Sequence, residues 1–139
     1  MDLWVRILMA ANVLSYHLSN GRLGSTMAGQ TVLLLNTVGR KSGKSYTTPI
    51  NYFRDGDNYL LVASNWGKDH HPAWFLNLMH QPSTVIQVKD QKLRIQARQA
   101  ADEEYGRLWQ YVTGKNQYYV EYQKQTTRRI PIVVLTPQA

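Results

Sequence analysis

The chain has 139 residues, of which 43% are hydrophobic, and carries a formal net charge of +7. This length suits one domain with one core, and the composition excludes disorder as the default. The absence of cysteine excludes disulfides, thiolate metal ligands and a cysteine nucleophile. The positive charge favours an anionic ligand, a nucleic acid or an anionic membrane surface, without choosing among them.

The amino-terminal segment predicts a helix, because apolar residues recur at three- and four-residue spacing from Asp2 to Leu18. This helix and a glycine-containing loop, together residues 1–29, should precede the barrel of a single domain spanning residues 1–139. No segment reaches the roughly 20 uninterrupted apolar residues of a spanning helix, so we expect a soluble, cytoplasmic protein. Packing on the core is the favoured role of the helix. The alternative is peripheral membrane contact through Trp4, Ile7 and Leu8.

The rest of the chain reads mainly as strands. Asp55-Gly56 predicts a hairpin turn, and Pro49 favours an edge strand. Because no strand-helix-strand alternation occurs, we expect a mainly β (α+β) antiparallel barrel of about six strands with appended helices. The expected strands are 31–38, 46–54, 58–64, 84–88, 92–100 and 130–135. The expected helices are 73–80, with Pro72 at its first position, a helix capped by Asp102 and broken at 113–115, and 116–125.

A small loop, Gly39-Arg-Lys-Ser-Gly43, separates the first two strands. Its backbone N–H groups, the Ser42 hydroxyl and cations that include the following Lys44 can all donate to one phosphate. The spacing is not that of a Walker A loop, so the sequence favours a phosphate site of another kind. In isolation the loop would be better explained as a surface turn with solvated cations.

Candidates for acid–base chemistry are few. The acidic residues fall in turns or caps, and His70-His71 has no further ligands at a recognisable metal-binding spacing. A bound cofactor would therefore have to supply the difficult step. Tyr119 and Tyr122 are three residues apart and share a helix face, where they can close a pocket over a flat ring or protonate an acceptor.

Five separated motifs resemble the deazaflavin-dependent nitroreductase family. They are the runs at 33–43, 48–56, 62–67, 71–78 and 130–134, in the family's order. The resemblance implies a split β-barrel of the flavin- and deazaflavin-binding type. It also implies coenzyme F420 as the cofactor and hydride transfer from the reduced deazaflavin to quinones, with nitroaromatics as adventitious acceptors.

The same resemblance implies roles for individual residues. Arg40, Lys41, Ser42 and Gly43 match the phosphate-binding group. Thr48, Pro49 and Ile50 match positions along the deazaflavin, Ala63, Ser64 and Asn65 positions beside its ring, and Ala73 and Trp74 positions near its other end. Ser64, Tyr119 and Tyr122 match the residues at the reacting centre and substrate pocket. The chain departs from the family at Tyr46, where an arginine is common, and at Asn51 and Asn116, where aromatic residues occur.

Other functions remain open at this stage. One is a carrier that binds a cofactor or a hydrophobic anion without turnover, and another is a reductase that uses flavin mononucleotide (FMN), which we consider less favoured than F420. A nucleic-acid binder is weaker still, because the basic residues are scattered rather than interleaved with aromatics. We expect a small-molecule acceptor, no metal and no nucleic acid; a homo-oligomer is compatible with the sequence.

Overall fold

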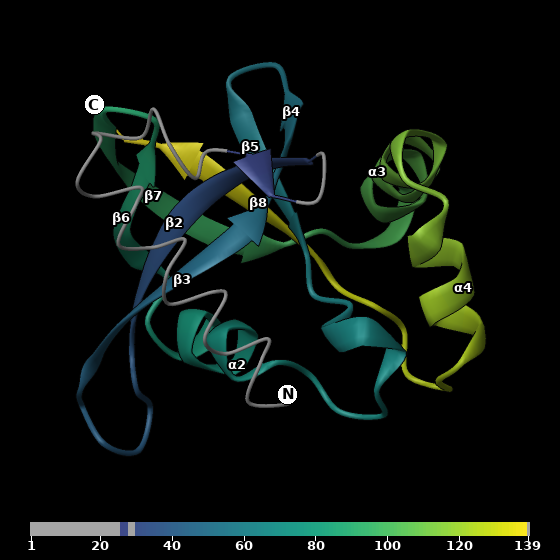
Figure 1. Cartoon of the computed structure of the whole chain (residues 1–139), viewed down its shortest axis with the longest axis horizontal. Helices are drawn as coiled ribbons and strands as arrows, with labels where there is room; N and C mark the ends of the chain where they lie inside the picture. Colours follow the sequence, from purple (N-terminus) through teal and green to yellow (C-terminus); the bar gives the residue numbers. More distant parts are fainter. Residues whose placement is uncertain (1–25, 28–29, 139) are drawn as a thin grey trace.

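The structure, a computed structural model, describes residues 26–27 and 30–138. Within these residues eight strands join in one antiparallel sheet that curls into a split barrel (Figure 1). The strands are β1 (Thr26–Met27), β2 (Gln30–Val38), β3 (Ser45–Asn51), β4 (Phe53–Asp55), β5 (Asn58–Val62), β6 (Ser83–Val88), β7 (Gln91–Gln99) and β8 (Ile132–Pro137). The other elements are the turn η1 (Asn65–Gly67) and the helices α2 (Ala73–His80), α3 (Asp102–Lys115) and α4 (Tyr118–Lys124).

The strand order is β1-β2-β6-β7-β8-β5-β4, and β3 pairs with Val32–Val38 of β2, a stretch that includes the two residues paired with β6. The predicted fold class is confirmed, but the strand count is higher than expected. The run predicted as one strand from Tyr46 to Arg54 changes partner near Tyr52: β3 pairs with β2, whereas β4 pairs with β5. Pro49 lies in β3, whose ladder partner is β2 alone, as an edge position requires.

The core has two parts, because both faces of β5 and β8 are covered. Leu61 and Val133 face the barrel interior, together with Leu33, Leu35 and Phe75. Leu60 and Val134 point the other way, toward a second cluster built on α3 and α4. Figure 1 shows these two helices beside the sheet, away from the β2–β3 loop. Strands covered on both faces read as continuous apolar runs, which explains the Ile-Pro-Ile-Val-Val-Leu sequence before the carboxyl end.

The β6–β7 hairpin and α2 follow the predicted pattern. Ile95 and Ala97 are buried on one face of β7, whereas Arg94 and Gln96 are exposed on the other. The helix α2 has the predicted bounds and buries Phe75 and Leu78. Pro72, predicted at the first helical position, is instead the N-cap residue, and the helix begins at Ala73.

Two predictions about α3 are wrong. Asp102 is not its N-cap: Ala101 occupies that position, and the Asp102 backbone is left-handed, with φ 54°. Nor does the helix break at 113–115; it continues to Lys115, and the Asn116 amide bonds to the Val112 carbonyl at 2.9 Å. Burial of Leu108 and Val112 on the same helix outweighs the penalty of about 1 kcal/mol for an interior glycine.

The predicted amino-terminal helix from Asp2 to Leu18 lies outside the described residues. Among the helices of the described part of the chain, none combines the length and apolar character needed to cross a bilayer.

Candidate active site

The loop between β2 and β3 (residues 39–44) is closed by its own hydrogen bonds. The Gly39 amide bonds to the Lys44 carbonyl at 2.8 Å, and the Gly43 amide bonds to the Gly39 carbonyl at 2.9 Å. The Ser42 hydroxyl accepts from the Lys44 amide at 3.2 Å. Within the described residues this leaves the amides of Lys41 and Ser42 without a protein acceptor, so both can donate to a ligand.

Arg40 is fixed by a contact with α2. The Oδ1 atom of Asn77 accepts the Arg40 backbone amide at 3.1 Å and its guanidinium at 2.8 Å. Asn77 is buried, whereas Arg40, Lys41 and Lys44 are exposed. No ion pair in the described part of the chain neutralises these three cations. The loop therefore presents uncompensated positive charge to an anion.

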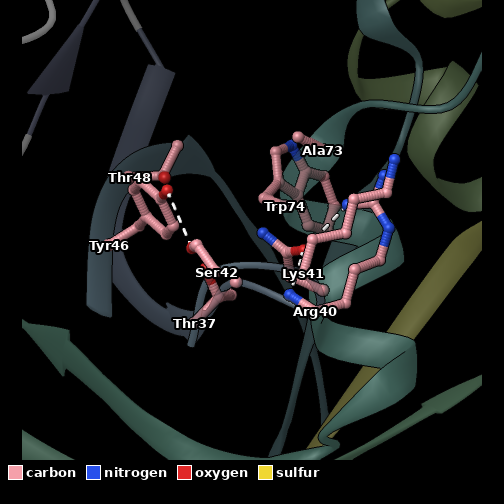
Figure 2. A pocket seen from close by; sticks show the side chains of 10 residues that line it. Thr37, Arg40, Lys41, Ser42, Tyr46, Thr48, Ala73 and Trp74 are labelled. Atoms are coloured by element: carbon pink, nitrogen blue, oxygen red, sulfur yellow. Dashed lines mark hydrogen bonds between the residues drawn. The ribbon is translucent and has the colours of Figure 1, made fainter. Parts of the chain in front are cut away.

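A cavity of about 390 Å³ lies between this loop, β3 and α2. Figure 2 shows Arg40 and Lys41 beside Trp74 on one side, with Ser42, Tyr46 and Thr48 on the opposite side. Tyr46 contacts the Ser42 hydroxyl through its own hydroxyl at 3.4 Å. The cavity lining is Thr37, Gly39, Arg40, Lys41, Ser42, Tyr46, Thr48, Ala73, Trp74 and Asn77.

The cavity thus brings together six of the cofactor residues expected from the sequence: Arg40, Lys41, Ser42, Thr48, Ala73 and Trp74. Gly43 does not line it; its φ of 70° closes the loop instead. Pro49 and Ile50 are buried farther along β3, with Ile50 in the same core cluster as Ala63. Ser64 lies just before η1 and Asn65 is its first residue; neither residue lines the cavity.

Arg128 organises the segment that contains Ser64 and Asn65. Its guanidinium donates to the carbonyls of Ala63 at 3.2 Å, Ser64 at 2.7 Å and Lys68 at 2.9 Å. It also contacts His71 Nδ1 at 2.9 Å. Because an arginine has only donors, this His71 nitrogen is the acceptor and the imidazole is neutral. Burial, and secondarily the Arg128 charge, lower the pKa of His71.

Two aromatic residues of α4, Tyr119 and Tyr122, face η1 and the second core cluster, whereas Tyr118 is exposed. Tyr119 is buried, and its ring meets that of Tyr122 edge-on with centroids 6.3 Å apart. Burial raises the pKa of Tyr119 to about 12, an effect that the Asn51 amide partly offsets. The phenol is therefore protonated at neutral pH and can donate a hydrogen bond. Asn51 Oδ1 is buried without a hydrogen-bond partner in the described structure, which leaves an acceptor at this position.

Sequence reasoning missed three residues that shape the site. Asn77 lies within the run 71–78, and its signal was a polar residue beside the apolar face of α2. Trp66 follows Asn65 and is 53% exposed. Arg128 carried no usable signal, because the carbonyl groups that it binds are about half the chain away in sequence.

A curled antiparallel barrel with a cationic loop above a cavity is the architecture of split-barrel cofactor-binding reductases. The family model described as F420H(2)-dependent quinone reductase matches residues 8–137, and the chain belongs to this family. A Mycobacterium tuberculosis protein named F420H(2)-dependent quinone reductase is 42% identical over 125 residues, which cover 87% of this chain and 84% of that protein.

Solved structures agree with this assignment. A chain described as an F420-H2 dependent reductase is 32% identical and superposes with a TM-score of 0.68 over 75% of this chain and 92% of its own. A second chain, described as a domain-swapped dimer, is 29% identical, with a TM-score of 0.72 over 95% of this chain and 96% of its own. The protein is an oxidoreductase that uses coenzyme F420 to reduce quinones.

Proposed function

We propose that the cavity beside the 39–44 loop holds the acidic end of coenzyme F420. The observation that carries this assignment is the donor set: the Ser42 hydroxyl, together with two amides and three cations that have no acceptor or ion-pair partner among the described residues. These groups fit a phosphate and a carboxylate-rich tail. The fixed guanidinium of Arg40 presents directional donors, whereas Lys41 and Lys44 add point charges.

We further propose that the rest of the cofactor follows the residues implied by the family resemblance. Thr48, Ala73 and Trp74 line the described cavity and would contact the part of the cofactor next to its acidic end. Gly43 would shape the 39–44 loop. Pro49, Ile50, Ala63, Ser64 and Asn65 would contact the deazaflavin, which would then extend from the cavity toward η1. The presence of Ile50 and Ala63 in one core cluster supports this direction.

At the acceptor side we assign Ser64, Tyr119 and Tyr122 to the reacting centre. The reduced deazaflavin supplies a hydride, and a quinone must also gain a proton to become a quinol. With a pKa of about 12, the Tyr119 phenol stays protonated at neutral pH and can donate a hydrogen bond to the quinone oxygen, with solvent as the ultimate proton source. Tyr122, which is only partly buried, would contact the ring of the acceptor.

The activity is tested by mixing the protein with reduced F420 and menadione and following oxidation of the cofactor. We expect turnover that depends on protein concentration. Absence of cofactor oxidation at every protein concentration would contradict the assigned reaction and would favour a carrier. Parallel titrations with F420 and FMN should show preferential binding of F420.

The anion site is tested by the double variant Arg40→Ala with Lys41→Ala. If both side chains make charge-assisted contacts, it should weaken F420 binding by about 2–4 kcal/mol. Lys92→Ala with Arg94→Ala is the matched control, because these exposed β7 residues carry the same charge and do not line the cavity. Equal weakening by both pairs would reduce the role of the loop to general electrostatic attraction.

Nitroaromatics are a second acceptor class that we propose. A nitro group is planar and conjugated with its ring, as a quinone carbonyl is, and it offers oxygen acceptors to the Tyr119 phenol. We expect reduced F420 to be oxidised by a nitroaromatic compound more slowly than by menadione. A rate equal to the background without protein would limit the enzyme to quinones.

We also propose that the enzyme acts in the cytoplasm as a homo-oligomer that touches the membrane surface peripherally. The similarity to a chain described as a domain-swapped dimer supports oligomerisation. The net charge of +7 and the apolar pattern in residues 2–18 support contact with an anionic bilayer. Light scattering tests the assembly. Cosedimentation with anionic and neutral vesicles tests the membrane contact, which should require anionic lipid.

A further inference from the structure

The η1 turn holds three consecutive residues in the left-handed backbone region. The φ angles are 48° at Asn65, 60° at Trp66 and 79° at Gly67. Side-chain-bearing residues adopt this region at a cost in free energy, and such residues persist only where the surroundings impose them. Asn65 and Trp66 are two adjacent residues of this kind, so surrounding contacts must impose the conformation of η1. Because the turn follows Ser64, its conformation also bears on the candidate active site.

The close approach of η1 to α4 supplies part of the cause. A Cβ atom at Gly67 would lie 3.0 Å from the Tyr122 carbonyl oxygen and 3.1 Å from the Tyr122 Cα. Gly67 therefore lets the turn contact the backbone of α4 directly. A side chain at this position would push η1 away from Tyr122.

Hydrogen bonds from Arg128 are the second cause of the left-handed conformation of η1. Arg128 bonds to the Ser64 carbonyl before the turn and to the Lys68 carbonyl after it, at 2.7 and 2.9 Å. The Asn65 side chain closes the same segment by donating to the His70 carbonyl at 3.0 Å. The guanidinium thus fixes both ends of η1. No carboxylate in the described residues forms an ion pair with Arg128, so its donors are used by this segment.

The strained turn does not bury Trp66. This side chain remains 53% exposed, and its indole meets the Tyr122 ring edge-on, with centroids 6.3 Å apart at 78°. Tyr122 in turn meets Tyr119 edge-on. Burial of the indole therefore does not account for the strain of η1. The turn places the indole of Trp66 next to Tyr122, at a position two residues after Ser64.

We propose that Trp66 is a specificity-determining contact for the planar acceptor, and that Arg128 is the residue that positions it. The indole and the Tyr122 ring would form the two aromatic sides of the acceptor site. This inference rests on the proposed function, since it concerns the acceptor of that same reaction. It assigns Trp66 no part in binding the acidic end of the cofactor, which lies at the 39–44 loop.

The first test compares Trp66→Ala with Trp66→Phe. For the alanine variant we expect the KM for menadione to rise about tenfold, whereas the dissociation constant for F420 and the melting temperature stay near those of the unaltered protein. Phenylalanine should restore most of the loss, because it retains an aromatic face. An unchanged KM in Trp66→Ala, with the unaltered protein active, would overturn the inference without affecting the proposed function.

A second readout does not depend on turnover. Menadione bound next to Trp66 should quench its fluorescence, so titration of the cofactor-free protein should show saturable quenching that Trp66→Phe largely removes. Quenching of equal amplitude in both proteins would place the acceptor elsewhere. If the unaltered protein shows no activity but Trp66-dependent quenching persists, the proposed reaction is contradicted, whereas the proposed contact between Trp66 and menadione is supported.

The positioning role is tested by a double-mutant cycle. Arg128→Lys keeps the charge but cannot span the same carbonyls, so it should raise the KM for menadione nearly as much as Trp66→Ala. Adding Trp66→Ala to it should cause little further change, because both substitutions remove the same contact. Additive effects would contradict the positioning role. Arg129→Lys is the matched control, since Arg129 packs 3.4 Å from the Tyr105 ring centroid instead, and it should leave this KM unchanged.

Discussion

A single carboxamide oxygen joins α2 to the 39–44 loop: Asn77 Oδ1 accepts both the Arg40 amide, at 3.1 Å, and the Arg40 guanidinium, at 2.8 Å. The two residues are 37 apart in sequence, and Asn77 is buried. The direction in which Arg40 faces the cavity is therefore set by a helix residue that itself has little contact with solvent.

Substitution Asn77→Leu keeps the side-chain volume and removes this acceptor. We expect the F420 dissociation constant to rise about tenfold, and the free energy of unfolding to fall by about 1–3 kcal/mol because polar N–H groups lose their partner. Fluorescence titration and denaturant unfolding measure the two effects. Asn77→Asp retains an acceptor and should keep the protein more stable than the leucine variant. Unaltered cofactor binding in Asn77→Leu would show that the fixed Arg40 geometry is dispensable.

Gly67 and Gly114 should respond in opposite ways to alanine. Gly67 has φ 79°, and an added Cβ would lie within 3.1 Å of the Tyr122 backbone. We expect Gly67→Ala to destabilise the protein by about 2–4 kcal/mol. Gly114 lies inside α3, and an added Cβ would meet no other atom within 4 Å, so Gly114→Ala should stabilise the protein by about 0.5–1 kcal/mol. Denaturant unfolding of both variants checks the contrast, and equal effects would contradict it.

The raised pKa of Tyr119 predicts a loss of stability at alkaline pH. Its pKa is about 12 in the folded protein and 10.0 when unperturbed. The folded state therefore keeps the phenolic proton more tightly, and the free energy of unfolding should decrease as pH rises from 10 toward 12. Tyr119→Phe should reduce this slope in denaturant unfolding. Tyr118→Phe is the matched control, because it removes a phenol from an exposed position of the same helix.

The lowered pKa of His71 predicts a loss of stability at acidic pH. Burial and Arg128 lower its pKa from the usual 6.5, so the unfolded chain binds the proton more readily than the folded one. The free energy of unfolding should then decrease as pH falls below 6.5. His71→Gln should reduce this dependence, with His80→Gln as a matched control at the exposed end of α2. A pH profile identical in both variants and the unaltered protein would be evidence against the effect.

Much of the fold could be predicted from local pattern. Alternation along β7, the Asp55-Gly56 turn and the prolines around α2 report side-chain direction and backbone preference, which act over a few residues. The same locality explains the errors. Gly114 reads as a break because its helix propensity is poor, yet the buried Val112 nearby keeps the helix intact. The partner change near Tyr52 was invisible because it depends on how the sheet curls.

The sequence by itself determined the mainly β class and the shortage of acid–base residues, since these follow from residue types and short spacings. Its five separated motifs carried the resemblance to the family. Tertiary structure alone decided which residues hold the 39–44 loop and the η1 turn in place. Arg128 reaches the Ser64 carbonyl across 64 positions, and Asn77 reaches Arg40 across 37. Such contacts form between donors and acceptors that the folded sheet brings together, and no local periodicity encodes them.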